Sequence, residues 1–436
     1  MLSQPRSEQD DFLALTKQWY NTVALQDELK RLRAKAWERY LERGLPNRKA
    51  EVFRYVRLRQ LFGKQLQLAE RSKVTEEEVA PYIYPECQGA LLVFVNGYFC
   101  PELSKTEALP DSLVVAPLRE AVRKFGTFLQ NQWAQTSKVE QDPFALLNAA
   151  LHPEGLFLYV PPKTVIETPI QIVHWTDGKA QDCVVSPRVE VFAGRESEIT
   201  LCQRFVEHQS NGYFLNHVLD ASVDEAATVR CLFEQMRQSP DVWQMHALRG
   251  SVKRDGRLHS VSLTDGARAV RSDYRVSLIG EGAETSLNGL WLLDERHEAH
   301  QNVLVEHQAP HCRSNQYFKG VLTDLARSSF EGKIYVHKEA QKTEAYQLNN
   351  NLVLSDKANA DCKPNLEIFA DDVRASHGAT IGQLEPEELF YLETRGVQKE
   401  FARNMLISGF CKEILDQVPL PSVRQRHAKR SISFLA

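Results

Sequence analysis

From about residue 155 to residue 382, apolar and polar side chains alternate along the chain with a period of two. This alternation is typical of short β-strands, and helical spacing is almost absent from the segment. Clear examples lie within 189–201, 229–233 and 287–293. The pattern therefore predicts a long middle segment built of strands and turns.

Small or turn-forming residues separate these strands at recurring intervals. The corners centre near residues 194, 225, 256, 282, 326 and 358, so the successive intervals are 31, 31, 26, 44 and 32 residues. A loose period near 30 predicts a solenoid, in which each coil lays its strands on the coil before it. A β-sandwich also contains many short strands, but the segment is too long for one sandwich.

Helical patterns precede this middle segment. Apolar residues recur at spacings of three and four within 8–43, and similar patterns occur near 117–132 and 143–151. Between them, residues 91–99 read as a strand element in which Asn96-Gly97 is a turn signal. These features predict a helical N-terminal region, residues 1–152, that contains a short strand element.

Helical patterns also follow the middle segment. Pro386 and the two glutamates after it form a favourable helix start, because proline fits the first turn and carboxylates favour the positive end of the helix dipole. Gly396 interrupts this helix, and a second one is expected over about 398–416. We therefore expect a β core over 153–384 and a helical C-terminal region over 385–436.

The composition excludes several classes of protein. The 436 residues are 43% hydrophobic and 25% charged, with a net charge of -4, which is ordinary for a globular protein. No apolar run approaches the roughly 18 residues of a membrane span, and the N-terminus shows no secretory signal. The eight cysteines lie at least 13 residues apart and form no metal-binding spacing, so we expect reduced thiols in a cytoplasmic protein.

The charge is unevenly distributed. Residues 30–59 hold eleven lysines and arginines against three glutamates, a local charge of +8 that leaves -12 for the rest of the chain. The near-neutral total argues against a dedicated nucleic-acid binder. A solvated helix face, or a surface for an acidic protein partner, is the favoured interpretation of the basic segment.

A screen for chemistry finds two candidate segments and no nucleotide motif. Gly332-Lys333-Ile334 resembles the end of a phosphate-binding loop but lacks the Ser/Thr that would hold magnesium. Four histidines and a cysteine lie within 16 residues, but their spacings match no compact site: His297, His300, His307, His311 and Cys312. A structural role is favoured for them, and a stand-alone metal-binding protein stays an alternative.

The second segment is 370–380, which contains Asp371, Asp372 and His377 followed by Gly378. Glycine after a histidine lets another backbone approach closely, so His377 is a candidate functional residue. The two aspartates would point to opposite faces of a strand and form a poor acid–base pair. A β-helix carbohydrate-active enzyme that uses them is the enzymatic alternative.

Several longer stretches of the chain are distinctive as a set. They are GLPNRKAEVFRY (44–55), VFVNGYF (93–99), LPDSLVVAPL (109–118), EHQAPHCRSNQYFKGVL (306–322), ARSSFEGKIYV (326–336), AQKTEAYQLNNNLVLSDKA (340–358), PNLEIFADDV (364–373), SHGATIG (376–382) and LFYLETRGV (389–397). Together they resemble the SufB/SufD family of iron–sulfur cluster assembly proteins. The resemblance covers most of the chain and is densest from residue 307 to residue 410.

Within this family the chain is similar to the SufD branch. It has Ser-His-Gly-Ala-Thr at 376–380, where SufB proteins tend to carry Glu-His-Glu-Ala-Thr. The cluster-building cysteine of SufB proteins falls on Leu348, which cannot ligate iron. Many SufD sequences also carry a cysteine where this chain has Ala375, so a metal or sulfur role of that cysteine does not carry over.

The resemblance implies a non-catalytic scaffold that pairs with SufB, β-helix to β-helix, and docks the ATPase SufC through about residues 386–416. His377 would be an iron or cluster ligand at the joint, where the iron–sulfur cluster is shared transiently with SufB. Asp372 is a candidate to orient its ring. No nucleotide site and no nucleic-acid or membrane partner are expected in this chain, while a homodimer in isolation and flavin binding are left open.

Pattern and resemblance together predict a mostly β fold. Its core is a right-handed parallel β-helix, flanked by the helical N-terminal and C-terminal regions.

Overall fold

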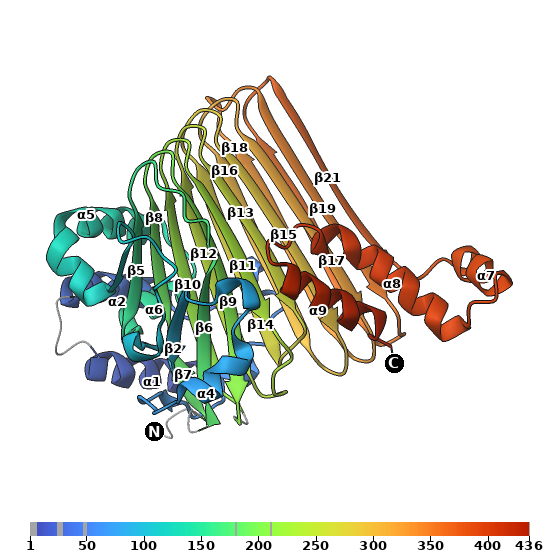
Figure 1. Ribbon diagram of the computed structural model, residues 1–436, viewed down its shortest axis with the longest axis horizontal. Coiled ribbons are helices and arrows are strands. Elements are labelled where there is room, and N and C mark those ends of the chain that lie inside the picture. The colour runs from blue at the N-terminus through green and yellow to red at the C-terminus, as the bar shows by residue number, and fades with distance from the viewer. Residues whose placement is uncertain (1–6, 24–28, 47–49, 179–180, 210–211, 436) are drawn as a thin grey trace, which may run out of the picture.

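The computed structural model describes residues 7–23, 29–46, 50–178, 181–209 and 212–435. Within this part of the chain, two long sheets of eleven strands (sheet A) and ten strands (sheet B) run along the molecule (Figure 1). From β8 (Arg188–Ala193) to β21 (Val373–Gly382) the chain alternates between the sheets, so each coil adds one strand to each. The strands of successive coils pair in parallel. The predicted parallel β-helix is confirmed.

The strands have the following bounds within the described residues. Sheet A contains β1 (Gln67–Leu68), β4 (Val114–Pro117), β5 (Gly155–Val160), β7 (Cys183–Val185), β8, β10 (Phe214–Val223), β12 (Trp243–Val252), β14 (Ala269–Leu278), β16 (Glu298–His307), β18 (Arg327–Val336) and β20 (Asn359–Ile368). Sheet B contains β2 (Leu91–Val95), β3 (Tyr98–Phe99), β6 (Ile170–Asp177), β9 (Glu198–His208), β11 (Thr228–Gln235), β13 (Arg257–Thr264), β15 (Glu284–Leu293), β17 (Arg313–Leu322), β19 (Thr343–Val353) and β21.

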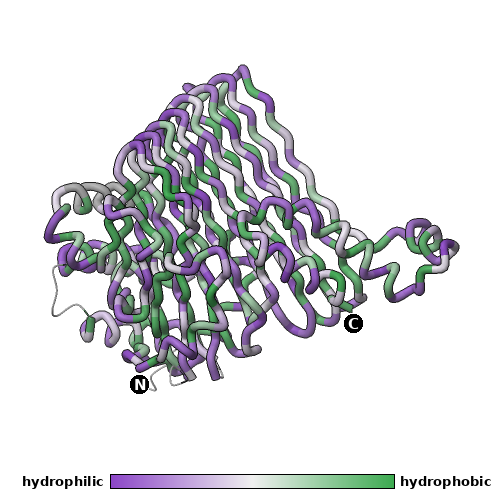
Figure 2. The backbone as a smooth tube through the Cα atoms, in the orientation of Figure 1, coloured by the Kyte–Doolittle hydropathy of each residue, from purple (hydrophilic) through white to green (hydrophobic). Residues whose placement is uncertain are grey.

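The strand pairing gives the coil length directly. Trp243 pairs with Phe214, Ala269 with Trp243 and Asn359 with Arg327, which corresponds to coils of 29, 26 and 32 residues. Alternate side chains point between the sheets and form one apolar core that runs along the solenoid. Figure 2 shows the corresponding change of hydropathy from residue to residue along the strands. The period near 30 in the sequence is therefore one coil.

In every coil before the last, the chain turns from sheet A to sheet B through a residue with a left-handed backbone, and we call this series the corner ladder. Its members have φ between 53° and 70° and are Lys163, Glu196, Ala226, Asp255, Gly282, His311 and Lys342. Each donates its backbone N–H to a carbonyl oxygen in the corresponding corner of the next coil. Only one of the seven is glycine, although this conformation favours glycine.

The corner ladder explains the irregular interval in the sequence. The corners near 194, 225, 256 and 282 lie on this edge of the solenoid, whereas those near 326 and 358 lie on the opposite edge. The interval of 44 residues is therefore not a coil. On the ladder edge, the corner that follows the one near residue 282 is Pro310-His311. Neither of these residues is small, so the sequence pattern does not mark this corner.

The N-terminal region closes the start of the solenoid. Its helices are α1 (Glu8–Val23), α2 (Lys30–Arg43), α3 (Arg59–Phe62), α4 (Glu76–Val79), α5 (Leu118–Val139) and α6 (Pro143–Leu151). The predicted helical stretch 8–43 is two helices, and residues 24–28 lie outside the described residues. The predicted turn is confirmed, because Asn96 and Gly97 join β2 to β3 with φ of 50° and 86°. Helix α6 packs on the outer face of sheet A.

Three helices follow the solenoid: α7 (Pro386–Thr394), α8 (Lys399–Leu415) and α9 (Pro421–Ile432). The first two match the predicted pair, and α9 is a third helix within the expected helical region. Helices α8 and α9 pack on the outer face of sheet B, whereas α7 projects away from the body (Figure 1). In the described part of the chain, no helix is both long and apolar enough to cross a membrane.

Candidate functional site

The last coil leaves one uncovered edge on each sheet. Among the described residues, β20 pairs only with β18 and β21 only with β19, and β21 is the outermost strand in Figure 1. Ile381 is 52% exposed here, whereas its register partner one coil earlier, Asn351, is buried, and Phe369 just after β20 is 57% exposed. We call residues 359–382 the open end. Free strand edges with exposed apolar side chains are typical of protein interaction surfaces.

His377 lies in β21 at the open end. It pairs in register with Gln347 of β19, whose side chain is buried between the sheets. Because in-register residues share a face of the sheet, His377 also points to the interior side, as do Ala375 and Ala379. No further coil covers it among the described residues, so His377 is exposed. Its imidazole is presented to whatever covers the open end.

The two aspartates before β21 lie in the last corner and are exposed. The backbone N–H of Asp372 donates to Gln341 Oε1 at 2.9 Å, and its carbonyl oxygen accepts a hydrogen bond from the Lys342 N–H. Five residues of extended chain separate Asp372 from His377, about 16 Å along the strand. The structure does not bring the carboxylate of Asp372 to the imidazole.

The histidines between 297 and 311 are held separately. His311 is a corner-ladder residue, and the others have different side-chain partners: Asp294 for His297, Ser329 for His300 and Ser314 for His307. Among the described residues, no three histidine, cysteine, aspartate or glutamate side chains gather as a metal site. The arrangement supports the structural interpretation of these histidines.

Three other histidines lie inside the β-helix and gave no signal in the sequence analysis. His174, His217 and His246 come from β6, β10 and β12 and are buried. The Nδ1 atoms of His217 and His246 are 2.8 Å apart, so one donates a hydrogen bond and the other accepts it. Burial lowers the pKa of His174 to about 4 and that of His246 to about 3. It also lowers the pKa of His217 well below its ordinary value.

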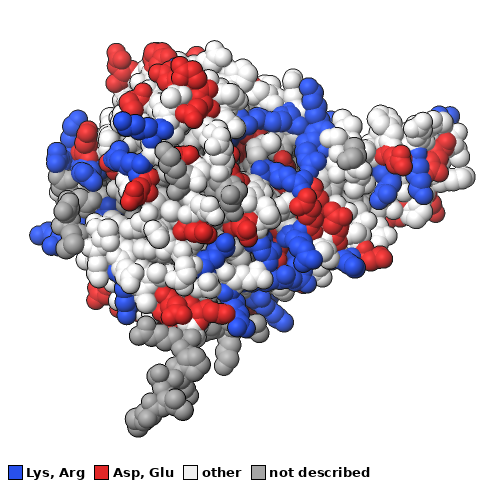
Figure 3. Space-filling model, turned by 90° about the horizontal axis from the view of Figure 1, so that it is seen from below, with Lys and Arg blue, Asp and Glu red and all other residues white. Residues whose placement is uncertain are grey.

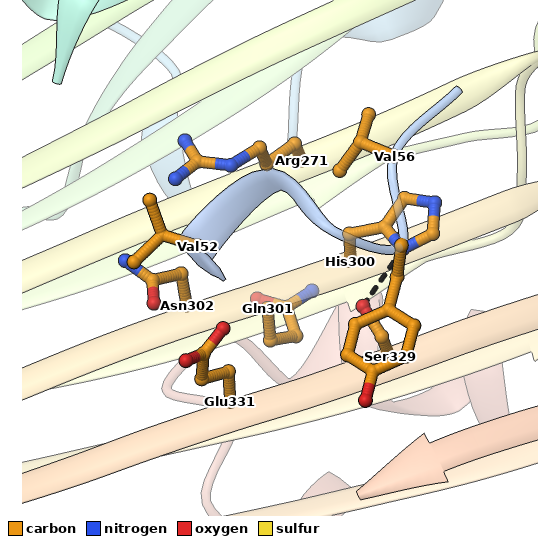
Figure 4. A pocket seen from close by; sticks show the side chains of 9 residues that line it. Val52, Val56, Arg271, His300, Gln301, Asn302, Ser329 and Glu331 are labelled. Carbon is orange, nitrogen blue, oxygen red and sulfur yellow. Dashed lines mark hydrogen bonds between the residues drawn. The ribbon is translucent and has the colours of Figure 1, made fainter. Parts of the chain in front are cut away.

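Buried charges join the N-terminal segment to the outer face of sheet A. Arg271 of β14 donates to Asp142 at 2.6 Å and to Asp273 at 2.8 Å, and its guanidinium lies over the ring of Phe53 at 4.0 Å. Figure 4 shows the hollow beside Arg271, which Glu331 also lines. Its volume of about 10 Å³ holds roughly one water molecule. This feature is a structural joint, too small for a substrate.

The basic segment 30–59 is partly used inside the protein. Arg33 is buried and donates to the carbonyl oxygens of Ala150 and His152 at the end of α6. Arg59 pairs with Glu8 at 2.6 Å. On the face of the molecule seen in Figure 3, lysines and arginines are interspersed with acidic residues. Residues 47–49 of this segment lie outside the described residues.

The C-terminal helices expose a second apolar surface. Phe390 and Tyr391 of α7 are 67% and 58% exposed, and Phe401 of α8 is also exposed. We call these three residues the aromatic surface. Helix α8 beneath it is fixed to sheet B, because Lys319 Nζ donates to Glu413 Oε2 at 2.8 Å. Exposed aromatic side chains on a firmly held helix are suited to binding another protein.

These features define a class of protein: a parallel β-helix whose free end and attached helices present surfaces for other chains. Comparison with known families makes the class specific. A model of the SufBD protein N-terminal region matches residues 7–172. A model of the SufBD core domain, from SUF-system iron–sulfur cluster assembly, matches residues 175–410. The chain belongs to the SufBD family and has a role in iron–sulfur cluster assembly.

Relatives span most of the chain. A SufBD family iron–sulfur cluster assembly protein of Synechocystis is 32% identical over 394 residues, which cover 88% of this chain and 86% of that protein. The iron–sulfur cluster assembly protein SufD of Escherichia coli is 26% identical over 400 residues, 89% of each chain. The chloroplastic protein ABCI7 of Arabidopsis thaliana is 27% identical over 414 residues, 91% of this chain and 84% of that protein.

Proposed function

We propose that this chain is a SufD-like, non-catalytic scaffold subunit that pairs through its open end with SufB. The observation that carries the proposal is the pair of uncovered strand edges, with Phe369 and Ile381 exposed beside them. A second β-helix laid on β20 and β21 would satisfy free backbone groups and bury these side chains. The similarity to a relative named SufD supports the choice of branch.

At this joint, His377 acts as a ligand to iron or to the cluster under assembly. Its imidazole lies on the interior side of the last coil and is exposed, so an iron ion held between the two proteins is within its reach. A neutral imidazole nitrogen suits Fe(II). SufB supplies further ligands, and the cluster is cargo that the pair shares transiently.

The C-terminal helices dock the ATPase SufC through about residues 386–416. The aromatic surface supports this assignment, because its residues lie on α7 and α8 and each is more than half exposed. Helix α8 packs on sheet B, so a movement of SufC bound to α8 would be transmitted to the β-helix. The scaffold chain itself then needs no nucleotide site.

The first test is the substitution His377→Ala in the complex with SufB and SufC. Cluster yield should fall at least tenfold while the complex still assembles, because the exposed ring supports no fold contact. His311→Asn, at another exposed histidine, is the matched control and should leave the yield unchanged. A full yield from the His377 variant would remove that residue from the proposal.

The second test separates the two docking surfaces. Phe369→Ala should weaken SufB binding, and Phe390→Ala should weaken SufC binding. Each change should cost about tenfold or more in affinity, since burial of a phenylalanine contributes about 2 kcal/mol. Neither change should affect the other partner. Equal loss of both partners from either variant, or no loss at all, contradicts the assignment.

A cytoplasmic, reducing location is part of the proposal and is supported by the thiols, since all eight cysteines are free. The isolated chain has no partner on its open end, so a second copy can occupy it. Sedimentation of the chain with and without SufB tests this: a homodimer, if present, should give way to the heterodimer.

A further inference from the structure

The last coil contains a thiol that the family resemblance does not assign. Cys362 lies in β20 and pairs in register with Phe330 of β18, a fully buried core residue. In-register residues share a face, so Cys362 points to the interior of the solenoid. His377 does the same from β21. The two strands that form the open end therefore each carry one metal-ligating side chain on their interior face.

Hydrogen bonds place the thiol close to the histidine strand. Cys362 Sγ donates to Asn349 Oδ1 at 2.8 Å and accepts from Asn351 Nδ2 at 3.3 Å. Asn349 of β19 is the register partner of Ala379, which is the next interior position after His377 on β21. Asn351 is likewise the register partner of Ile381, so the thiol lies level with the first and second interior positions after His377.

A buried amide oxygen without a hydrogen-bond partner among the described residues lies in the same place. Gln347, the register partner of His377, is only 2% exposed. Its Nε2 donates to Gln316 Oε1 at 2.7 Å, but its Oε1 has no hydrogen-bond partner among the described residues. A buried acceptor left unpaired is costly, and its position beneath His377 is suited to an N–H of that ring or to a metal-bound water.

Cys362 differs from the other thiols in access. Six of the eight cysteines are buried, and the remaining half-exposed one, Cys183, lies in β7 near the start of the solenoid. Cys362 is half-exposed, and the solenoid ends directly beyond it. It is therefore the cysteine that a metal ion at the open end can reach.

We propose that Cys362 and His377 offer a thiolate and an imidazole to one thiophilic divalent metal ion, Fe(II) in the working complex. This inference rests on the proposed function, because the remaining ligands would come from the protein that covers the open end. Nitrogen and sulfur donors together suit Fe(II), Co(II) and Zn(II).

The binding step exchanges a proton for the metal. The S–H bond of Cys362 breaks, an S–metal bond forms, one proton leaves to solvent, and no electron is transferred. Burial, followed by the nearby Asp361 carboxylate, raises the pKa of Cys362 to about 11. Because the metal displaces this proton, metal binding should tighten as the pH rises.

The test uses Co(II) as a redox-stable substitute for Fe(II), added to the full-length chain under reducing conditions. A thiolate-to-cobalt absorption band should appear in the near ultraviolet, and Cys362→Ser should abolish it. His377→Ala should raise the Co(II) concentration for half-saturation at least tenfold. Cys183→Ser is the matched control and should leave the titration unchanged. Unfolding in urea checks that each variant is folded.

The outcomes separate this inference from the proposed function. If Cys362→Ser keeps the cobalt band, or if wild-type protein gives none, the inference fails whatever the complex does. If Cys362→Ser lowers cluster yield in the complex with SufB and SufC to the level of His377→Ala, that result also supports the inference in the assembled complex. Failure of the chain to bind SufB through β20 and β21 would overturn the proposed function while the cobalt result stands.

Discussion

Acidification from pH 7 to pH 5 should weaken the β-helix from inside. His174, His217 and His246 are buried and neutral, and the pKa is lowered to about 4 for His174 and about 3 for His246. In the unfolded chain each returns to about 6.5. At pH 5 the unfolded chain binds protons that the folded chain does not, so the free energy of unfolding falls as the pH drops below about 6.5.

The expected size follows from these values. A histidine that titrates at 6.5 when unfolded and stays neutral when folded contributes about 2 kcal/mol to the loss of stability between pH 7 and pH 5. These three histidines together give a loss of about 6 kcal/mol, a large part of the typical stability of a domain. His152 and His307, whose pKa values burial also lowers, add to this loss. The loss continues until the folded-state pKa values are reached.

Urea unfolding at pH 7 and pH 5, followed by tryptophan fluorescence, measures the effect. His246→Phe keeps a buried ring but removes one titrating group, so the loss between the two pH values should shrink by about 2 kcal/mol. His311→Asn removes an exposed histidine and should leave the loss unchanged. If His246→Phe and wild type lose the same stability on acidification, the core histidines do not cause it.

Two further predictions concern packing. Glu234 accepts hydrogen bonds from Tyr84 and His427, so Glu234→Gln should lower the free energy of unfolding by about 3 kcal/mol. The same substitution should make α9 susceptible to limited proteolysis. If α9 stays resistant, contacts other than those of Glu234 hold it in place. Gly320→Ala would place a methyl group 2.1 Å from the Trp291 indole nitrogen and should cost about 1–3 kcal/mol. Gly382 has open space around it, so Gly382→Ala should change the free energy of unfolding by less than about 0.5 kcal/mol. Thermal unfolding of both glycine variants measures the two effects.

The strands and most of the helices could be predicted because their signals are local. Period-two alternation marks each strand, and the turn at Asn96-Gly97 has a strong residue preference. The corner at His311 could not be found this way, because its left-handed residue is not a glycine. Hydrogen bonds to the neighbouring coils hold His311 in that conformation. Tertiary pairing, rather than local preference, decides such a position.

The candidate site is visible in the sequence only in part, for the same reason. His377 was singled out from its own segment, whereas the relation of Cys362 to it depends on the register of β18 with β20 and of β19 with β21. No short stretch of sequence contains that register. The core histidines were missed likewise, because a histidine on a strand gives no sign of which face it occupies.

The corner ladder stops at the last coil. Among residues 369–372, all of which are described, none has a positive φ, so this corner lacks the conformation that directs an N–H forward from every earlier corner. A second copy stacked head to tail would find no rung to continue, and repeated head-to-tail stacking is the geometry that produces filaments. This corner therefore offers an arriving coil one backbone hydrogen bond fewer than each earlier corner does, while the edges of β20 and β21 stay free for a partner.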